Sequence, residues 1–273
     1  MTHADASEKF RAGDLGGAID AAVAAVKQGP TDTDARGFLS ELLCFNGDVV
    51  RADKHLDLIN DQDTSVATGV ALFRQILRGE MARQEVFARG RPPEMLDDPP
   101  AHLSLSLKAL AALREDAAGE AAELTDAAEA KRPAIDGVRD SVSFADWRDL
   151  DDLLSGVMEV ITSTGKYYWV PLERIASLSL EAPTRARDLL WRKAEIVVRG
   201  GPEGVVYLPA TYPGTAESGD DTLKLGRATT WIDPETGPIR GLGLRTFLFD
   251  EQDVPVMELQ SLTTEPPNEG AAP

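Results

Sequence analysis

A glycine–lysine pair, Gly165-Lys166, follows a run of hydroxyl residues at 162–164 and raises the question of a phosphate site. A phosphate-binding loop requires G-x-x-x-x-G-K-[ST], because its glycines let backbone N–H groups converge on the phosphates and its hydroxyl reaches the metal ion. Val160 stands where the first glycine should be, and Tyr167 follows the lysine. The pattern therefore favours a turn that leads into an aromatic strand over a nucleotide site.

The aromatic run Tyr167, Tyr168 and Trp169 comes directly after this turn. Successive side chains of a strand point to opposite faces, so at least one of the three must face away from the other two. Two interpretations remain open: Trp169 belongs to the core, or some of the three residues form an exposed anchor for a partner. Exposed tyrosine and tryptophan are frequent anchors of protein interfaces.

Residues that could support catalysis or bind a metal are few. The histidines His3, His55 and His102 do not have H-x-x-x-H spacing, and Cys44 is the only cysteine, so neither a zinc site nor a disulfide is indicated. No cofactor is expected.

Four acidic residues between 149 and 159 could suggest a divalent-ion site: Asp149, Asp151, Asp152 and Glu159. The favoured interpretation places them on the solvent side of an amphipathic helix, without a metal ion. An alternative enzyme hypothesis uses the basic residues Lys166, Arg187 and Arg192 to hold an anionic substrate, together with an acid such as Asp188. Ion pairs with neighbouring carboxylates explain the basic residues more simply.

The composition restricts the class of partner. The chain has 273 residues and a formal net charge of −18. Such a surface repels nucleic acid and anionic membranes, so neither is expected as a partner. The N-terminus is polar and lacks the apolar run of a signal peptide, and no stretch is long and apolar enough for a spanning helix. We expect a cytoplasmic protein.

The first half of the chain contains an internal repeat. Gly13-Asp14 recurs 34 residues later as Gly47-Asp48, and Ala18 recurs as Ala52. This period is typical of tetratricopeptide repeats, in which glycine allows the turn between two helices and a small residue lets them approach closely. Degenerate hairpins at 65–90, with a Gly-Glu turn, and at 102–133 complete an expected α-solenoid of about four hairpins. Candidate partner-binding residues on the first helices of the repeats are Phe38, Glu41, Phe45, Arg74 and Arg78.

The second half has a different pattern. A helix is expected over 143–162, and beyond it short strand-like runs are separated by Gly- and Pro-rich turns. Short strands at this spacing predict a compact, mostly antiparallel β domain. The fold class is therefore α+β, with a tetratricopeptide-like helical domain at 1–140, a β-rich domain with a leading helix at 141–262 and a disordered tail at 263–273.

Several blocks of the second half resemble the ImpE/SciE family, also called TagJ: WRDLDDLL at 147–154, GKYYWVPLERI at 165–175, APTRARDLLWRKAEI at 182–196 and GLGLRTFLFDE at 241–251. The resemblance covers the chain from about residue 5 to 260. It implies a non-enzymatic, cytoplasmic accessory protein of a bacterial type VI secretion system. The implied partners are a short helix of the small contractile-sheath subunit and the AAA+ unfoldase that recycles contracted sheath. The enzyme hypothesis and a permanent structural subunit of another assembly remain as alternatives.

Overall fold

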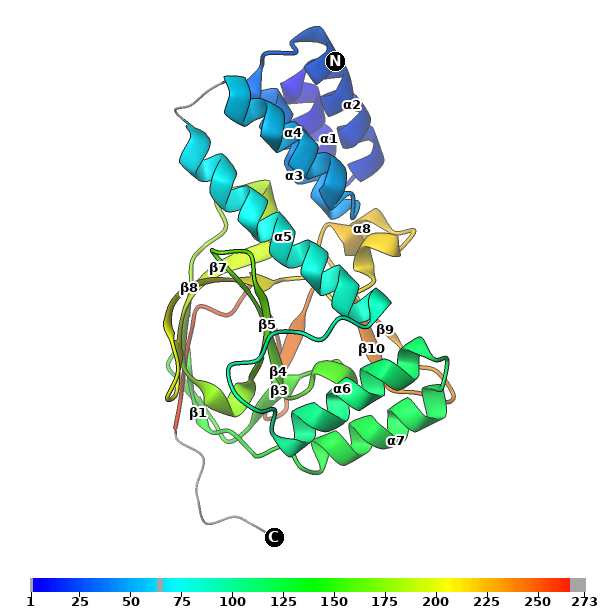
Figure 1. Cartoon of the computed structure of the whole chain (residues 1–273), viewed down its shortest axis with the longest axis vertical. Coiled ribbons are helices and arrows are strands. Elements are labelled where there is room, and N and C mark those ends of the chain that lie inside the picture. The colour runs from blue at the N-terminus through cyan, green and yellow to red at the C-terminus, as the bar shows by residue number, and fades with distance from the viewer. Residues whose placement is uncertain (1, 63–65, 266–273) are drawn as a thin grey trace.

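The computed structural model describes residues 2–62 and 66–265, with side chains from Asn60 to Gln62 excepted, and it confirms the α+β class. Figure 1 shows helices α1 to α4 at one end of the molecule, a long helix α5 crossing its middle, and a hairpin of α6 and α7 at the other end beside the β domain. The helices are α1 (His3–Ala12), α2 (Leu15–Gln28), α3 (Thr33–Phe45), α4 (Val49–Gln62), α5 (Ala67–Arg89), α6 (Ala101–Arg114), α7 (Ala118–Glu129) and the short α8 (Asp221–Lys224).

The first two hairpins have the turn that the repeat predicts. Gly13 and Gly47 both adopt positive φ, +91° and +76°, a conformation that glycine adopts without steric cost. Asp14 caps α2 by accepting a hydrogen bond of 2.7 Å from the backbone N–H of Gly17. Ala18 and Ala52 are fully buried, as expected where two helices approach closely.

The third predicted hairpin is wrong, because α5 is one continuous helix through the expected Gly-Glu turn. Gly79 lies inside this helix and does not form a turn. Instead it lets α5 lie directly against the sheet: a Cβ there would come within 2.4 Å of the Ile161 side chain. The fourth hairpin is present as α6 and α7, but it lies at the far end of α5, so α1–α4 and α6–α7 do not form one continuous solenoid.

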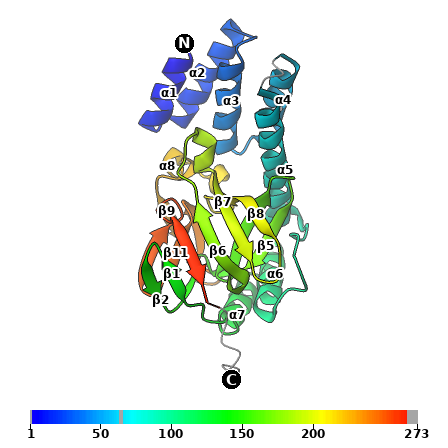
Figure 2. The ribbon, with the colours of Figure 1, turned by 90° about the vertical axis from the view of Figure 1, so that its left-hand side faces the viewer.

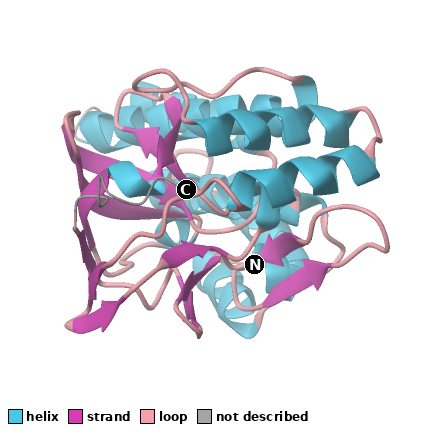
Figure 3. Cartoon of the chain, turned by 90° about the horizontal axis from the view of Figure 1, so that it is seen from below, coloured by secondary structure: helices cyan, strands magenta, loops and turns pink. Residues whose placement is uncertain are grey.

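The β domain is built from antiparallel pairs. Its largest sheet has the order β2-β1-β13-β6-β7-β8-β4-β5, and two smaller sheets contain β12-β11-β3 and β10-β9. Figure 2 looks onto the large sheet, and Figure 3, from below, shows the helices gathered on one side of the molecule and many strands along the other. The strands are β1 (Gly137–Arg139), β2 (Val142–Phe144), β3 (Trp147–Asp149), β4 (Val157–Thr162), β5 (Tyr167–Pro171), β6 (Ile175–Leu180), β7 (Trp191–Val198), β8 (Glu203–Pro209), β9 (Thr229–Ile232), β10 (Arg240–Gly243), β11 (Thr246–Phe249), β12 (Gln252–Pro255) and β13 (Ser261–Thr264).

The helix predicted over 143–162 does not exist. This stretch forms the end of β2, then β3, a 3-10 turn η2 (Asp152–Leu154) and β4. Strand β4 is buried on both faces. Val157 and Ile161 face the hydrophobic core beneath α5, and Met158 and Val160 face a separate core on the other side of the sheet. A strand buried on both faces loses the alternation of apolar and polar residues that would have identified it.

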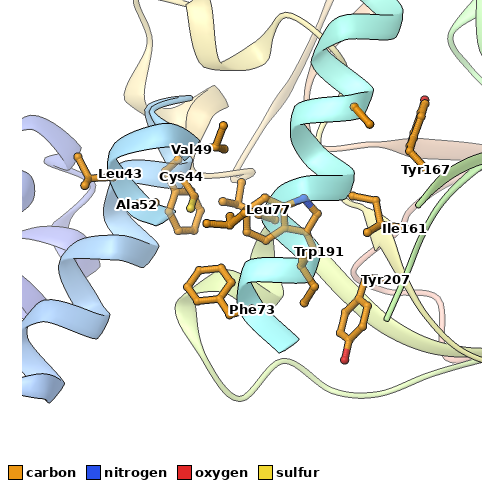
Figure 4. Close-up of a cluster of buried hydrophobic side chains, with 14 of the residues drawn as sticks. Leu43, Cys44, Val49, Ala52, Phe73, Leu77, Ile161, Tyr167, Trp191 and Tyr207 are labelled. Atoms are coloured by element: carbon orange, nitrogen blue, oxygen red, sulfur yellow. The ribbon is translucent and has the colours of Figure 1, made fainter. Parts of the chain in front are cut away.

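Two hydrophobic cores lie on the two faces of the large sheet. The one toward the helices includes Phe73 and Leu77 of α5 and Trp191 of β7, whose ring centroid lies 6.2 Å from that of Phe73 (Figure 4). Tyr167 and Trp169 point into this core, whereas Tyr168 packs against the opposite one. The outer edge of β5 is covered by the Pro-rich connection between α5 and α6, since the backbone of Glu94 bonds to Tyr167 and Trp169.

The β domain extends beyond both expected boundaries. It begins at Gly137 with β1, before residue 141, and Thr263 and Thr264 of the expected disordered tail belong to β13. Glu265 is also described, and its backbone N–H donates to the carbonyl of Asp136, whereas residues 266–273 lie outside the described residues.

We predict that Gly79→Ala destabilises the fold by about 1–3 kcal/mol, because the new methyl group would force α5 away from Ile161. Gly69→Ala in the same helix is the matched control: its Cβ would meet nothing within 4 Å, so the higher helix propensity of alanine should leave stability unchanged or raise it by up to about 1 kcal/mol. Urea unfolding of both variants measures the difference. Equal effects of the two substitutions would contradict the close packing of α5 on β4.

Candidate functional site

A cleft of about 630 Å³ opens between the α3–α4 turn, the C-terminal half of α5 and the loop at 211–217. Phe45, Val49 and Val50 line it from the helical hairpin, and Met81, Gln84 and Phe87 line it from α5. Its volume lies in the range of sites that hold small molecules or side chains of a partner. Its walls combine apolar side chains with six charged ones: Glu80, Arg83, Glu85, Arg89, Glu217 and Lys224.

The base of the cleft reaches a buried ionic network centred on Glu159 of β4. Glu159 has no exposed surface, and its carboxylate accepts hydrogen bonds from Arg83 Nε at 2.7 Å and Arg83 Nη2 at 3.2 Å. Arg245, from the residue pair between β10 and β11, also donates to this carboxylate, and so does the hydroxyl of Tyr167. Trp169 Nε1 donates to the Tyr167 oxygen at 2.7 Å.

The electrostatics of this network decide the charge of Glu159. Its burial alone would raise the pKa, but the positive charges of Arg83 and Arg245 outweigh that penalty and hold the pKa of Glu159 at about 2. Glu159 is therefore ionised at neutral pH. Because Arg83 belongs to α5 and Glu159 to the sheet, the pair fastens the helical half of the chain to the β domain.

A second part of the network surrounds Asp149 of β3. Its Oδ1 accepts hydrogen bonds from the Tyr212 hydroxyl at 2.8 Å and from the backbone N–H of Asp151 at 2.9 Å. Burial raises the pKa of Asp149 to about 7, and the charge of Arg245, 3.6 Å away, limits that rise. Asp151 is also buried, and it pairs with Arg240 at 2.7 Å.

The sequence-based placement of these acids was wrong. Asp149, Asp151 and Glu159 were expected on the solvent side of a helix, but all three are inside the protein. Within residues 2–62 and 66–265, no group of three or more His, Cys, Asp or Glu residues is arranged to hold a metal ion. Arginines take the place that a cation would occupy beside these carboxylates.

Three residues predicted to bind a partner are covered by the chain's own atoms. Tyr167 and Trp169 are buried and offer no exposed anchor, Phe45 is buried although its side chain lines the cleft, and Tyr168 is half-buried. For the aromatic run, the core interpretation of Trp169 is confirmed.

The remaining predicted residues lie at different places on α3 and α5. Phe38 is half-buried and packs edge-on against Phe10, and Glu41 lies 3.9 Å from Arg187 of the 3-10 turn η4 (Ala186–Leu189). Arg74 pairs with Asp53 at 2.7 Å and also with Asp57. Arg78 is exposed.

The β domain covers the end of the helical repeats, which sequence reasoning missed. Lys224 of α8 donates to Asn46 at 2.9 Å, and Arg227 donates to the carbonyl of Phe10 at 2.8 Å. Asp221 accepts a hydrogen bond of 2.9 Å from the backbone N–H of Leu15. These contacts join segments more than 170 residues apart, and no local sequence pattern signals such pairing.

The residues of the enzyme hypothesis have separate partners. Arg187 lies over the ring of Phe73 and beside Glu41, whereas Arg192 donates to the carbonyls of Glu181 and Val256. Asp188 accepts hydrogen bonds from Thr184 and Arg185 and so closes a local turn. Lys166 is exposed in the β4–β5 turn.

Sequence reasoning also missed Glu80 and Arg83. Glu80 was assigned to a turn, but it is buried on α5 and accepts a hydrogen bond of 3.0 Å from Trp191 Nε1. One signal was available: two opposite charges three residues apart on the apolar side of a helix indicate a buried ion pair.

Comparisons with known proteins agree with this fold. The family model described as "ImpE protein" matches residues 141–263. The type VI secretion system accessory component TagJ of Pseudomonas aeruginosa is 36% identical over 262 residues, which are 96% of this chain and 91% of that protein. The chain belongs to the ImpE family. A crystal structure of a Vibrio parahaemolyticus protein superimposes with a TM-score of 0.89 at 28% identity and covers 95% of this chain and 97% of that one.

The family match spans most of the β domain. The ImpE match at 141–263 contains Glu159, Asp149 and Arg245, and Arg83 reaches this block from the helical half. Among the described residues, no helix of this ImpE protein is both long and apolar enough to cross a membrane.

We predict that Glu159→Gln lowers the free energy of unfolding by about 3–5 kcal/mol, because the buried Arg83 and Arg245 lose the carboxylate they share and retain only Glu80 at 3.4 Å and Asp149 at 3.6 Å. Glu195→Gln is the control, since Glu195 is exposed on β7 and its replacement should change stability by less than about 0.5 kcal/mol. Urea unfolding of both variants gives the two values. A loss below about 1 kcal/mol for Glu159→Gln would contradict the structural role of the network.

We also predict a pH dependence from Asp149. Between its usual pKa of 3.8 and its folded pKa of about 7, the folded chain retains a proton that the unfolded chain has released. The free energy of unfolding should therefore fall as pH rises, by up to about 1.4 kcal/mol per pH unit, and level off above about pH 7.

Asp149→Asn removes this titration while retaining an oxygen that can accept from Tyr212. Urea unfolding from about pH 5 to pH 8 should show a smaller slope in the variant than in the wild type, and the contributions of other groups cancel in the difference. Parallel curves for the two proteins would rule out Asp149 as the titrating group.

Proposed function

We propose that this protein is a non-enzymatic, cytoplasmic adaptor of a type VI secretion system. In this proposal it binds a helical segment of the small contractile-sheath subunit and assists the AAA+ unfoldase in sheath recycling. The ImpE membership and the name of the Pseudomonas aeruginosa relative, a type VI secretion system accessory component, support the assignment to this system. The cleft beside α5 supports the mode of binding.

The shape and chemistry of the cleft fit the apolar face of an amphipathic helix. Val50 at its rim is 55% exposed, and Met81 and Phe87 are only partly buried, so these apolar side chains are accessible for packing. A helix laid into a hydrophobic groove, with anchors one turn apart, is a common mode of peptide recognition. The cleft walls come from α4, α5 and the 211–217 loop, which the contacts of α8 and of Glu159 hold together.

Charge favours a helix with basic residues beside its apolar face. The whole chain carries a net charge of −18, whereas the cleft itself is lined by three acidic and three basic side chains, and Glu85 among them pairs with Arg91. Complementary charge accelerates association and makes it depend on salt concentration. The arginine of the cleft base, Arg83, is already paired with Glu159 and would not repel a basic partner strongly.

The inner face of α3 is a weaker candidate for the docking surface. Glu41 faces Arg187, and replacing Glu41 with lysine would disturb the fold as well as any partner contact. Arg78 is exposed and remains a usable probe of the surface expected from the repeats.

We predict that Val50→Asp weakens binding of a labelled peptide carrying the sheath-subunit helix by about tenfold or more, because it puts a charge into the apolar groove. Val142→Asp is the matched control, since Val142 is also 55% exposed but lies on β2, outside the cleft. Fluorescence anisotropy gives both affinities, and circular dichroism verifies folding. If Val50→Asp leaves the affinity unchanged and Arg78→Glu lowers it, the peptide docks outside the cleft.

A further inference from the structure

Strand β9 presents an open edge. Its four residues, Thr229–Ile232, pair with β10 on one side, and no other strand of the described residues pairs with it. In an antiparallel ladder every second residue directs its N–H and C=O to a given neighbour, so half of the backbone groups of β9 point outward. The outer edge of β5, in contrast, is not open, because the backbone of Glu94 bonds to it.

The exposed side chains of this strand are apolar. Trp231 is 38% exposed and Ile232 is 49% exposed, and they point to opposite faces because they are neighbours in a strand. Trp231 pairs with Gly241 across the hairpin, and its ring lies 5.7 Å from that of Tyr212. Ile239, two residues before Gly241 and 38% exposed, lies on the same face as Trp231.

Natural proteins usually protect an edge strand with lysine, proline, a bulge or a covering loop. None of these lies within residues 229–232, and Pro234 comes only after the strand has ended. An open edge that presents Trp231 and Ile232 is therefore a template onto which another strand can add, with main-chain hydrogen bonds for affinity and alternate side chains for specificity.

The charges around β9 favour a basic partner segment. Asp233 and Glu235 follow the strand, are exposed and have no ion pair among the described residues. The hairpin tip lies beside the start of α7, since a Cβ at Gly237 would lie 3.4 Å from Ala118. Arg240 on the paired strand is neutralised by Asp151. A second copy of this chain would bring the same acids against each other.

We propose that the β9 edge is a second interaction surface, which takes an extended, lysine- or arginine-bearing segment of a partner protein by strand addition. Trp231 contacts the side chains on one face of that segment, Ile232 contacts those on the opposite face, and the exposed acids Asp233 and Glu235 beyond the end of the strand supply the complementary charge. This surface does not share lining residues with the cleft beside α5.

A labelled peptide of alternating lysine and valine, about eight residues long, is the probe, and the same peptide with glutamate in place of lysine is its control. The full chain should bind the lysine peptide saturably in fluorescence anisotropy, with hydrogen-exchange protection at residues 229–232. Ile232→Lys should weaken binding at least about tenfold. The new lysine repels the lysines of the probe, and a charged side chain on an edge strand discourages pairing with another strand.

Leu58→Lys is the matched control variant, since Leu58 is 46% exposed on α4, far from the hairpin in sequence, and it should bind as the wild type does. Absence of saturable binding up to about 1 mM, equal binding of the glutamate peptide, or protection at residues other than those of β9 would overturn the proposal. A wild-type dimer in sedimentation that Ile232→Lys abolishes would assign the edge to a second copy and also overturn it.

Discussion

The carboxylate of Glu159 is the point on which the two halves of this molecule depend. It is fully buried, and it receives Arg83 from α5 and Arg245 from the chain between β10 and β11. Removing three charges from water is costly, and only their mutual attraction with good hydrogen-bond geometry offsets that cost. Since each arginine comes from a different segment, the network forms only when α5, β4 and the β10–β11 connection are all in place. It therefore specifies the docking of the helices on the sheet.

The neighbouring packing depends on the same arrangement. Gly79 lets α5 approach Ile161, and Trp191 of β7 donates to Glu80 one residue further along the helix. With α5 fixed in this way, its C-terminal half becomes one wall of the cleft, and the 211–217 loop becomes another. The contacts of Lys224 and Arg227 with the first hairpins then fix the remaining wall. A pre-formed cleft loses less conformational entropy when a partner binds.

The sequence predicted those features that depend on local chemistry. The turns at Gly13 and Gly47 need a residue that tolerates positive φ, and a 34-residue period reveals them. The antiparallel β domain follows from short runs separated by turn residues. The helix over 143–162 was wrong because β4 is buried on both faces, so its apolar run carries no strand period. The burial of Asp149 and Glu159 could not be read from the chain, because their arginine partners lie 76 to 96 residues away in sequence.

The most direct test of the docking account is photo-crosslinking in cells that assemble the secretion system. A photoreactive amino acid replaces Met81 inside the cleft in one strain and Arg78 outside it in another. We predict an adduct with the small sheath subunit from position 81 and little or none from position 78. An adduct with that subunit from position 78 alone would contradict the cleft as the docking surface, and no adduct from either position would contradict the proposed partner.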